Sequence, residues 1–318
     1  MEYQYDSQIK EVVAYAPHID LADLSATRAM LVDLAASFPP YTPSDAVRLE
    51  EFTIPARGHT PAVDVFVLTG ADAPKGGRPA VLWFHGGGFV LGDARESLPF
   101  LDKVVMDTGG VAVSVQYRLA PETPFPGAAD DAHSALIWLL EMQEHFSLDL
   151  ERIAIGGQSA GAALAAGLVL RARDENGPKI AFQLLDIPVT DDRCATQSAV
   201  EYTDTLVWNR ANALLGWKAY LDDNTEQVSP YAVPARAKDL SNLPPTFITI
   251  NQFDPLRDEG LEFARRLAHA NVPTELHLYA GTFHGSSAIV AAAAVSERQN
   301  ADIRNAFCRA LLMGGGKA

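Results

Sequence analysis

The serine best suited to nucleophilic chemistry is Ser159, in a G-x-S-x-G pattern at residues 157–161. A short apolar run at residues 153–155 predicts a buried strand before it, and Ala/Leu-rich sequence predicts a helix after it. A sharp strand-to-helix turn strains the backbone, so the positions two residues either side of the serine must be nearly free of side chain. The pattern indicates a serine that attacks a carbonyl carbon. The alternative is an ordinary strand–turn–helix with a chance serine.

Three consecutive glycines, Gly86, Gly87 and Gly88, follow His85 and a second apolar run. Backbone without side chains can approach a ligand closely, and its N–H groups can stabilise the negative charge that develops on a substrate oxygen. A phosphate-binding loop is the alternative, but no Lys-Ser/Thr pair follows and the G-x-G-x-x-G spacing is absent. The glycines therefore predict an oxyanion hole, with the N–H of Ala160 as a further donor.

A serine nucleophile needs a base, and the base needs an acid that orients it. Among eight histidines, His284 is placed best, because it follows an expected strand at residues 275–279 and a short turn. Asp254 follows the preceding expected strand, at residues 246–250, and is the predicted acid. As an alternative, Asp254 caps a helix that has Pro255 at its first position.

The elements that must position these side chains alternate between apolar strands and helices. Residues 47–54 and 62–68 are expected to form a hairpin at one sheet edge. Runs that are apolar on both faces predict parallel strands at residues 80–84, 110–115, 153–155, 182–187, 246–250 and 275–279. Helices are expected near residues 94–107, 128–146, 160–173 and 257–270. This alternation predicts an α/β fold with a mostly parallel, doubly wound sheet.

Two segments depart from this rhythm and are expected to form a helical cap over the carboxyl ends of the strands. Residues 7–38 have helical periodicity, and residues 192–243 form an insertion with a helix near 209–222. We therefore expect one domain over residues 1–318, with a cap from about 1–40 and 192–243 and a catalytic core from 41–191 and 244–313. A glycine-rich tail at 314–316 is expected to be disordered. Large apolar side chains expected to line the substrate pocket are Phe38, Tyr41, Leu206, Trp208 and Trp217.

Composition excludes several classes of partner. The 318 residues carry a net charge of −15, which argues against nucleic acid or an anionic membrane as a partner. Cys194 and Cys308 form neither a disulfide framework nor a metal-type spacing, so both are expected to be unpaired thiols in a reducing compartment. The N-terminus lacks the features of a signal peptide, and no apolar run is long enough to span a bilayer. A cytoplasmic protein without metal or cofactor is predicted, and a homodimer is left open.

Together these motifs resemble the hormone-sensitive-lipase-like esterases of the α/β-hydrolase fold, also known as bacterial lipolytic family IV. The resemblance covers about residues 75–290 and includes motifs at 85–89, 117–126, 157–161, 254–259 and 283–285. It implies that Ser159 is the nucleophile, His284 the base and Asp254 its partner, in the order of α/β-hydrolases. It places oxyanion donors on the glycine loop and Ala160, with Gly87 and Gly88 favoured and Gly86 left open.

The resemblance also implies hydrolysis of small-molecule carboxylic esters with short to medium acyl chains, without a cofactor. Arg118 is expected to pair with Asp130 or Asp131. The sequence departs from the family pattern at Gln158, where an acidic residue or threonine is usual, and also at Ala162 and Ala163.

Two alternative functions remain at this stage. An amidase, deacetylase or lactonase would use the same three side chains. A non-catalytic small-molecule receptor belongs to a different class, since the related gibberellin receptors have lost the histidine. The presence of His284 argues against a receptor.

Overall fold

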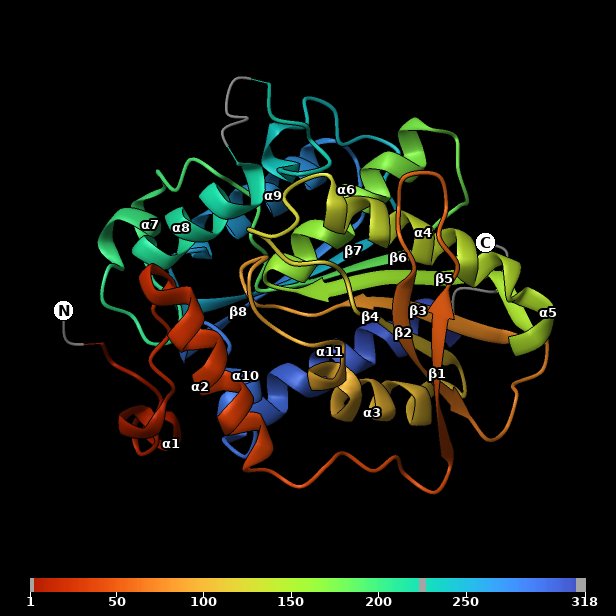
Figure 1. Cartoon of the computed structure of the whole chain (residues 1–318), viewed down its shortest axis with the longest axis horizontal. Coiled ribbons are helices and arrows are strands. Elements are labelled where there is room, and N and C mark those ends of the chain that lie inside the picture. The colour runs from red at the N-terminus through yellow and green to blue at the C-terminus, as the bar shows by residue number, and fades with distance from the viewer. Residues whose placement is uncertain (1–2, 223–226, 313–318) are drawn as a thin grey trace.

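A computed structural model describes residues 3–222 and 227–312, so the glycine-rich tail at 314–316 lies outside the described residues. Its centre is an eight-stranded sheet with the strand order β1-β2-β4-β3-β5-β6-β7-β8 (Figure 1). The first two strands form the antiparallel hairpin at one edge, and β3 to β8 pair in parallel. This confirms the predicted fold class. The strands are β1 (Val47–Ile54), β2 (Val63–Gly70), β3 (Arg78–Phe84), β4 (Val111–Val115), β5 (Leu148–Gln158), β6 (Phe182–Asp186), β7 (Thr246–Phe253) and β8 (Thr274–Phe283).

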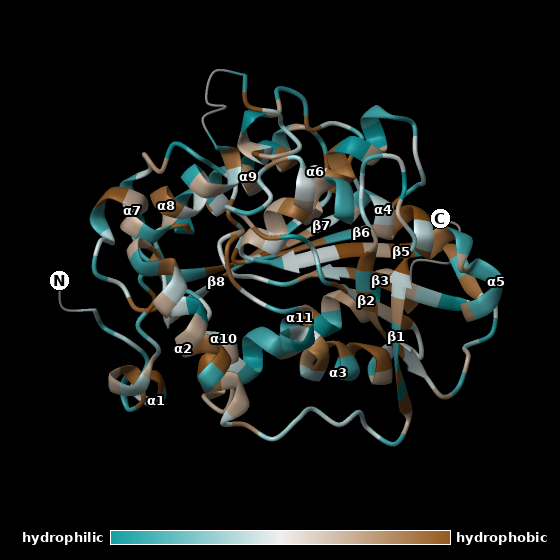
Figure 2. Cartoon of the chain, in the orientation of Figure 1, coloured by the Kyte–Doolittle hydropathy of each residue, from teal (hydrophilic) through white to brown (hydrophobic). Residues whose placement is uncertain are grey.

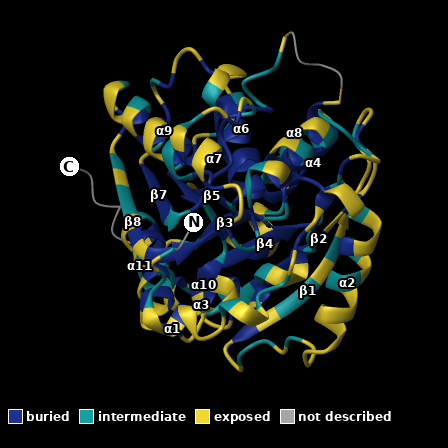
Figure 3. Ribbon diagram, turned by 90° about the vertical axis from the view of Figure 1, so that its left-hand side faces the viewer, coloured by how far each residue is buried: buried dark blue, intermediate teal, exposed yellow. Residues whose placement is uncertain are grey.

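Helices cover both faces of this sheet. One layer contains α4 (Gly127–Glu141), α6 (Ala160–Asp174) and α9 (Arg257–His269), and the opposite layer contains α3 (Leu98–Thr108) and α11 (Ala294–Leu312). A short helix, α5 (Gln143–Phe146), follows α4. Because both faces are covered, β4 and β6 are buried at every position, which explains why most of their residues are apolar (Figures 2 and 3).

The two cap segments lie together at the carboxyl ends of the strands. The N-terminal segment contains α1 (Ser7–Lys10) and α2 (Leu24–Ala36), and the insertion contains α7 (Gln197–Glu201) and α8 (Arg210–Leu221). Asn212 of α8 joins the segments, since its Nδ2 donates to the Ile19 carbonyl over 2.8 Å and its Oδ1 accepts from the Leu21 amide over 3.0 Å. The N-terminal helical region is broken between α1 and α2, where Pro17 supplies no backbone donor.

Arg118 pairs with Asp131, one of the two expected partners. Its Nη2 lies 2.7 Å from Asp131 Oδ1, and Asp131 is fully buried. Asp130 instead binds Arg171 over 3.0 Å. Both cysteines are free thiols. Within the described part of the chain, no helix is both long enough and apolar enough to cross a membrane.

Candidate active site

Ser159 lies on a strained turn between β5 and α6. Its φ is 54° and its ψ is −116°, a conformation that L-residues rarely adopt. A Cβ on Gly157 would overlap the Gly161 carbonyl, and a Cβ on Gly161 would overlap the carbonyls of Phe84 and His85. The turn therefore requires glycine at both positions, which is the physical basis of the pattern at residues 157–161. The Ser159 amide donates to the Asp186 carbonyl over 2.8 Å and holds the turn against β6.

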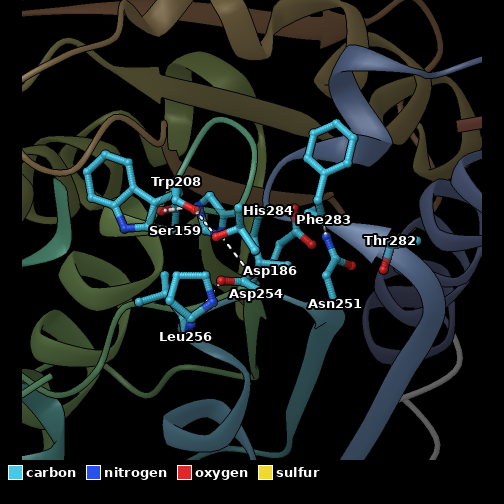
Figure 4. A network of polar contacts seen from close by, with 12 residues as sticks. Ser159, Asp186, Trp208, Asn251, Asp254, Leu256, Thr282, Phe283 and His284 are labelled. Carbon is cyan, nitrogen blue, oxygen red and sulfur yellow. Dashed lines mark hydrogen bonds and ion pairs between the residues drawn. The ribbon is translucent and has the colours of Figure 1, made fainter. Parts of the chain in front are cut away.

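Ser159, His284 and Asp254 meet at the carboxyl ends of three different strands (Figure 4). Ser159 Oγ lies 2.9 Å from His284 Nε2, and His284 Nδ1 lies 2.7 Å from Asp254 Oδ2. All three residues are buried. An ionised carboxylate only accepts hydrogen bonds, so it fixes the proton on Nδ1 and leaves Nε2 to accept the serine proton. The geometry is that of an activated nucleophile.

Asp254 is the one carboxylate of its motif that the structure brings to His284. Its second oxygen accepts a hydrogen bond from the Leu256 amide over 2.9 Å, so the side chain orients the imidazole and also supports the turn into α9. Asp258 Oδ2 instead accepts from the Ser198 amide over 2.8 Å, and Glu259 Oε1 accepts from the Thr190 amide over 2.6 Å. Asp258 therefore supports the insertion, and Glu259 supports the chain just before it.

A buried amide that sequence reasoning missed supports the His284 loop. Asn251 Nδ2, on β7, donates to the Phe283 carbonyl over 2.7 Å, and Asn251 is fully buried. The next residue, Gln252, accepts from the Gly281 amide through Oε1 over 2.8 Å. The only sequence signal for these contacts is a polar pair at the end of an otherwise apolar strand.

The glycine loop lies beside the nucleophile with its carbonyls bound. The Gly87 carbonyl accepts from the Leu91 amide over 2.8 Å, and the Tyr117 hydroxyl donates to the His85 carbonyl over 2.8 Å. None of the described residues accepts a hydrogen bond from the amides of Gly87 or Gly88. The amide of Ala160, at the start of α6, has no acceptor within its own helix. These amides are available to a substrate oxygen.

His85 does not place a positive charge beneath this loop. Its ring is stacked on Tyr117 at a centroid distance of 4.1 Å and is buried. Burial lowers the pKa of His85 to about 4, so the imidazole is neutral near neutral pH. His85 Nδ1 lies 2.7 Å from the Gly86 carbonyl oxygen and therefore carries the ring proton.

Of the expected pocket residues, Trp208 comes nearest to the catalytic groups. Its ring centroid is 6.1 Å from that of His284, and a Cβ on Gly88 would overlap the indole. Trp217 packs behind the glycine loop, with its ring 5.0 Å from Phe89. Leu206 packs against a small cluster that includes Phe283.

The structure does not bring Phe38 and Tyr41 into contact with the catalytic groups. The chain after α2 runs past α3 to β1 instead of continuing in the cap (Figure 1). The Tyr41 hydroxyl accordingly donates to Asp102 Oδ2 on α3 over 2.7 Å, and Phe38 is 65% exposed. The geometry therefore gives no support to a pocket role for these two residues.

Comparisons with known proteins agree with this geometry. Residues 81–288 match a family described as alpha/beta hydrolase fold. Esterase LipI of Mycobacterium tuberculosis is 41% identical over 209 residues, which span 65% of this chain and 65% of LipI. Carboxylesterase NlhH of the same organism is 35% identical over 243 residues, 75% of each chain.

Among solved structures, a bacterial heroin esterase is 44% identical, with a TM-score of 0.93 over 97% of this chain and 98% of that one. The fold, the order of the motifs and these relatives agree. The chain belongs to the hormone-sensitive-lipase-like family of carboxylic ester hydrolases with the α/β-hydrolase fold.

Proposed function

We propose that this protein hydrolyses carboxylic esters of short to medium acyl chain length through an acyl-enzyme on Ser159. The observation that carries the proposal is the buried chain of contacts from Ser159 Oγ through His284 to Asp254, at 2.9 and 2.7 Å. It lies beside backbone amides that are free to bind an oxyanion. Nucleophile, base and acid in this arrangement support acyl transfer.

In the proposed reaction, Ser159 Oγ attacks the ester carbonyl while His284 Nε2 takes its proton. Asp254 stabilises the imidazolium that forms. The amides of Gly87, Gly88 and Ala160 bind the developing oxyanion, with Gly86 as the remaining candidate donor. His284 then returns the proton to the leaving alcohol, and a water molecule activated by the same imidazole hydrolyses the acyl-enzyme.

The cap, taken as residues 1–40 and 192–243, is proposed to limit the substrate. Trp208 belongs to this cap and packs on both Gly88 and His284, so an apolar wall borders the reacting centre. Such a wall favours small acyl and alcohol groups. The contact between Ser159 and His284 disfavours the receptor alternative, because a receptor has no use for an activated serine. The free thiols Cys194 and Cys308 support a cytoplasmic location.

A substrate panel tests this proposal. The p-nitrophenyl esters of acetate, butyrate and octanoate, the p-nitroanilide of butyrate and a γ-lactone are compared at equal concentration. We expect the short esters to be turned over fastest, and Ser159→Ala to lower their kcat by at least about 10³-fold without loss of fold. Amide or lactone turnover that exceeds ester turnover would contradict the proposal, as would full activity in Ser159→Ala.

A further inference from the structure

A buried carboxylate lies beneath the catalytic groups and orients the residue that precedes the nucleophile. Asp186, at the end of β6, is 3% exposed and lies close to His284 and Ser159 in Figure 4. Its Oδ2 accepts from Gln158 Nε2 over 2.8 Å. Its Oδ1 accepts from the Thr249 hydroxyl and, over 3.1 Å, from Gln299 Nε2. Burial raises the pKa of Asp186, and the three donors directed at its oxygens oppose that shift, so the side chain acts as an acceptor in all three contacts.

This contact fixes which way the Gln158 amide faces. Because the NH2 end of the amide donates to Asp186, Gln158 Oε1 points away from that side chain. It points toward the glycine loop, where it lies 3.5 Å from the position that a Cβ on Gly86 would occupy. No described residue donates a hydrogen bond to this oxygen. The neighbour of the nucleophile thus presents a free acceptor.

The acceptor faces a cavity of about 320 Å³. Gly86, Gln158 and Asp186 line the end beside the nucleophile, since the same Cβ position on Gly86 is 3.5 Å from Ser159 Cβ. Ser287, three residues after His284, lines it as well. The remaining walls are mixed: apolar side chains such as Trp83, Phe100 and Ile303 alternate with the polar and charged Glu96, Ser97, Lys103, Asn300 and Arg304.

A second acceptor without a partner lines the same cavity. His85 is 1% exposed, and its Nε2 has no hydrogen-bond partner among the described residues. Because Nδ1 carries the proton, Nε2 is a lone pair that can only accept. Buried acceptors are nearly always paired, so His85 Nε2, with the half-buried Gln158 Oε1 at the same cavity, indicates a ligand that brings donors.

The position of the base decides which part of the ester occupies this cavity. The leaving alcohol must lie against His284 Nε2 to receive its proton, on the side that Trp208 covers. The acid part is then left to extend toward Gly86 and Gln158. We infer that this cavity is the acyl pocket, and that Gln158 Oε1, with His85 Nε2 behind it, selects acids that carry a hydrogen-bond donor near the carbonyl, such as hydroxy acids.

The inference rests on the proposed esterase function and is tested with two matched esters, p-nitrophenyl butyrate and p-nitrophenyl 3-hydroxybutyrate. The measured quantity is the ratio of their kcat/KM values, corrected for the ratio of their rates with hydroxide. One added hydrogen bond between neutral groups predicts a corrected ratio of about 3 to 10 in favour of the hydroxy ester. A ratio of one or below in the wild-type enzyme would overturn the inference without any variant. Failure to hydrolyse either ester would instead overturn the proposed function.

Variants then assign the preference to Gln158. Gln158→Met has a similar length but no acceptor, so its corrected ratio should fall to one. Gln143→Met, which changes an exposed glutamine on α5, should keep the wild-type ratio and is the matched control. A preference that persists in Gln158→Met would contradict the assigned role. Should that variant fold poorly, Asp186→Asn changes the carboxyl group that orients Gln158 and should also lower the ratio.

A last comparison tests whether the acid part of the ester, and not the alcohol part, occupies this cavity. Ethyl butyrate and 2-hydroxyethyl butyrate, followed by acid release, place the hydroxyl on the alcohol instead. We expect no preference between them. A preference confined to this pair would assign the cavity to the alcohol and contradict the acyl-pocket assignment.

Discussion

The loops at the strand ends and the cap meet at one site, but they hold their residues in different ways. Ser159, Asp254 and His284 are 4%, 1% and 5% exposed, and each follows the end of a strand of the sheet. The cap is looser, since the second half of α2 is exposed and Val32 reaches 68%. The insertion contributes Trp208, a single large side chain against the catalytic groups.

This difference separates catalysis from selectivity. Groups that move protons must be held to a fraction of an ångström, and buried strand ends meet that requirement. Groups that only border the substrate can sit on segments with few contacts. Changes in the strand-end loops should therefore affect kcat strongly, whereas changes in the cap should affect the choice of substrate.

Apart from removal of the nucleophile itself, Asp254→Asn should give the largest effect among the variants that keep the fold. The amide leaves the geometry nearly intact but stabilises the wrong imidazole tautomer, so kcat should fall by about 10³ to 10⁴-fold. Asp258→Asn is the matched control, because Asp258 binds the Ser198 amide and Arg257 rather than His284. Steady-state kinetics that show the reverse order would mean that the acid is misassigned.

Gly161→Ala tests whether the close packing of the turn positions Ser159. The new Cβ would overlap the carbonyls of Phe84 and His85, so the turn must shift away from β3. A displacement of about 1 Å should lower kcat by about 10²-fold, with a smaller change in KM. Gly177→Ala, at a looser position after α6, should leave kcat near the wild-type value. Equal kinetics for the two variants would contradict this account.

The buried His85 should make stability depend on pH. Burial lowers its pKa from 6.5 to about 4, so between these values the unfolded chain binds a proton that the folded chain does not. Above pH 6.5 His85 is neutral in both states and does not change the free energy of unfolding. As the pH falls from 6.5 toward 4, the unfolded state binds the proton first, so the free energy of unfolding falls by about 3 kcal/mol in total.

The measurement is the free energy of unfolding by urea at several pH values, for the wild type and for His85→Gln. The difference between the two curves is needed because it removes the contributions of the other titrating groups, which both proteins share. A difference curve that is flat between pH 6.5 and 4 would show that His85 does not titrate as described.

Trp208→Ala should give the smallest effect on rate and the clearest effect on selectivity. Removal of the indole opens the wall beside Gly88 on the alcohol side, so kcat/KM for octyl acetate relative to ethyl acetate should rise by about tenfold. Trp217→Ala is the control, because Trp217 packs behind the loop on Phe89 and should change stability without this shift. An unchanged chain-length preference in Trp208→Ala would show that the cap does not contact the bound substrate.

How far the sequence predicts the site depends on the kind of contact. Ser159, Asp254 and His284 each follow a strand, and the parallel order brings such strand ends to one edge. The contact between Gln158 and Asp186 instead depends on the register of β5 against β6, which periodicity does not specify. The position of Tyr41 is not predictable in the same way, because its segment is held by contacts of Tyr41 and Ser44 with Asp102, about 60 residues away.

The central claim is that Ser159 is the nucleophile of an ester hydrolase, and covalent labelling tests it most directly. A p-nitrophenyl alkylphosphonate transfers its phosphonyl group to an activated serine and releases p-nitrophenol. Mass spectrometry of the intact chain and of its peptides should show one adduct per chain, on Ser159, with loss of ester turnover in proportion to labelling. Ser159→Ala should show no adduct. Labelling of Ser286 or Ser287, which lie buried just after His284, or turnover that survives complete labelling, would contradict the account.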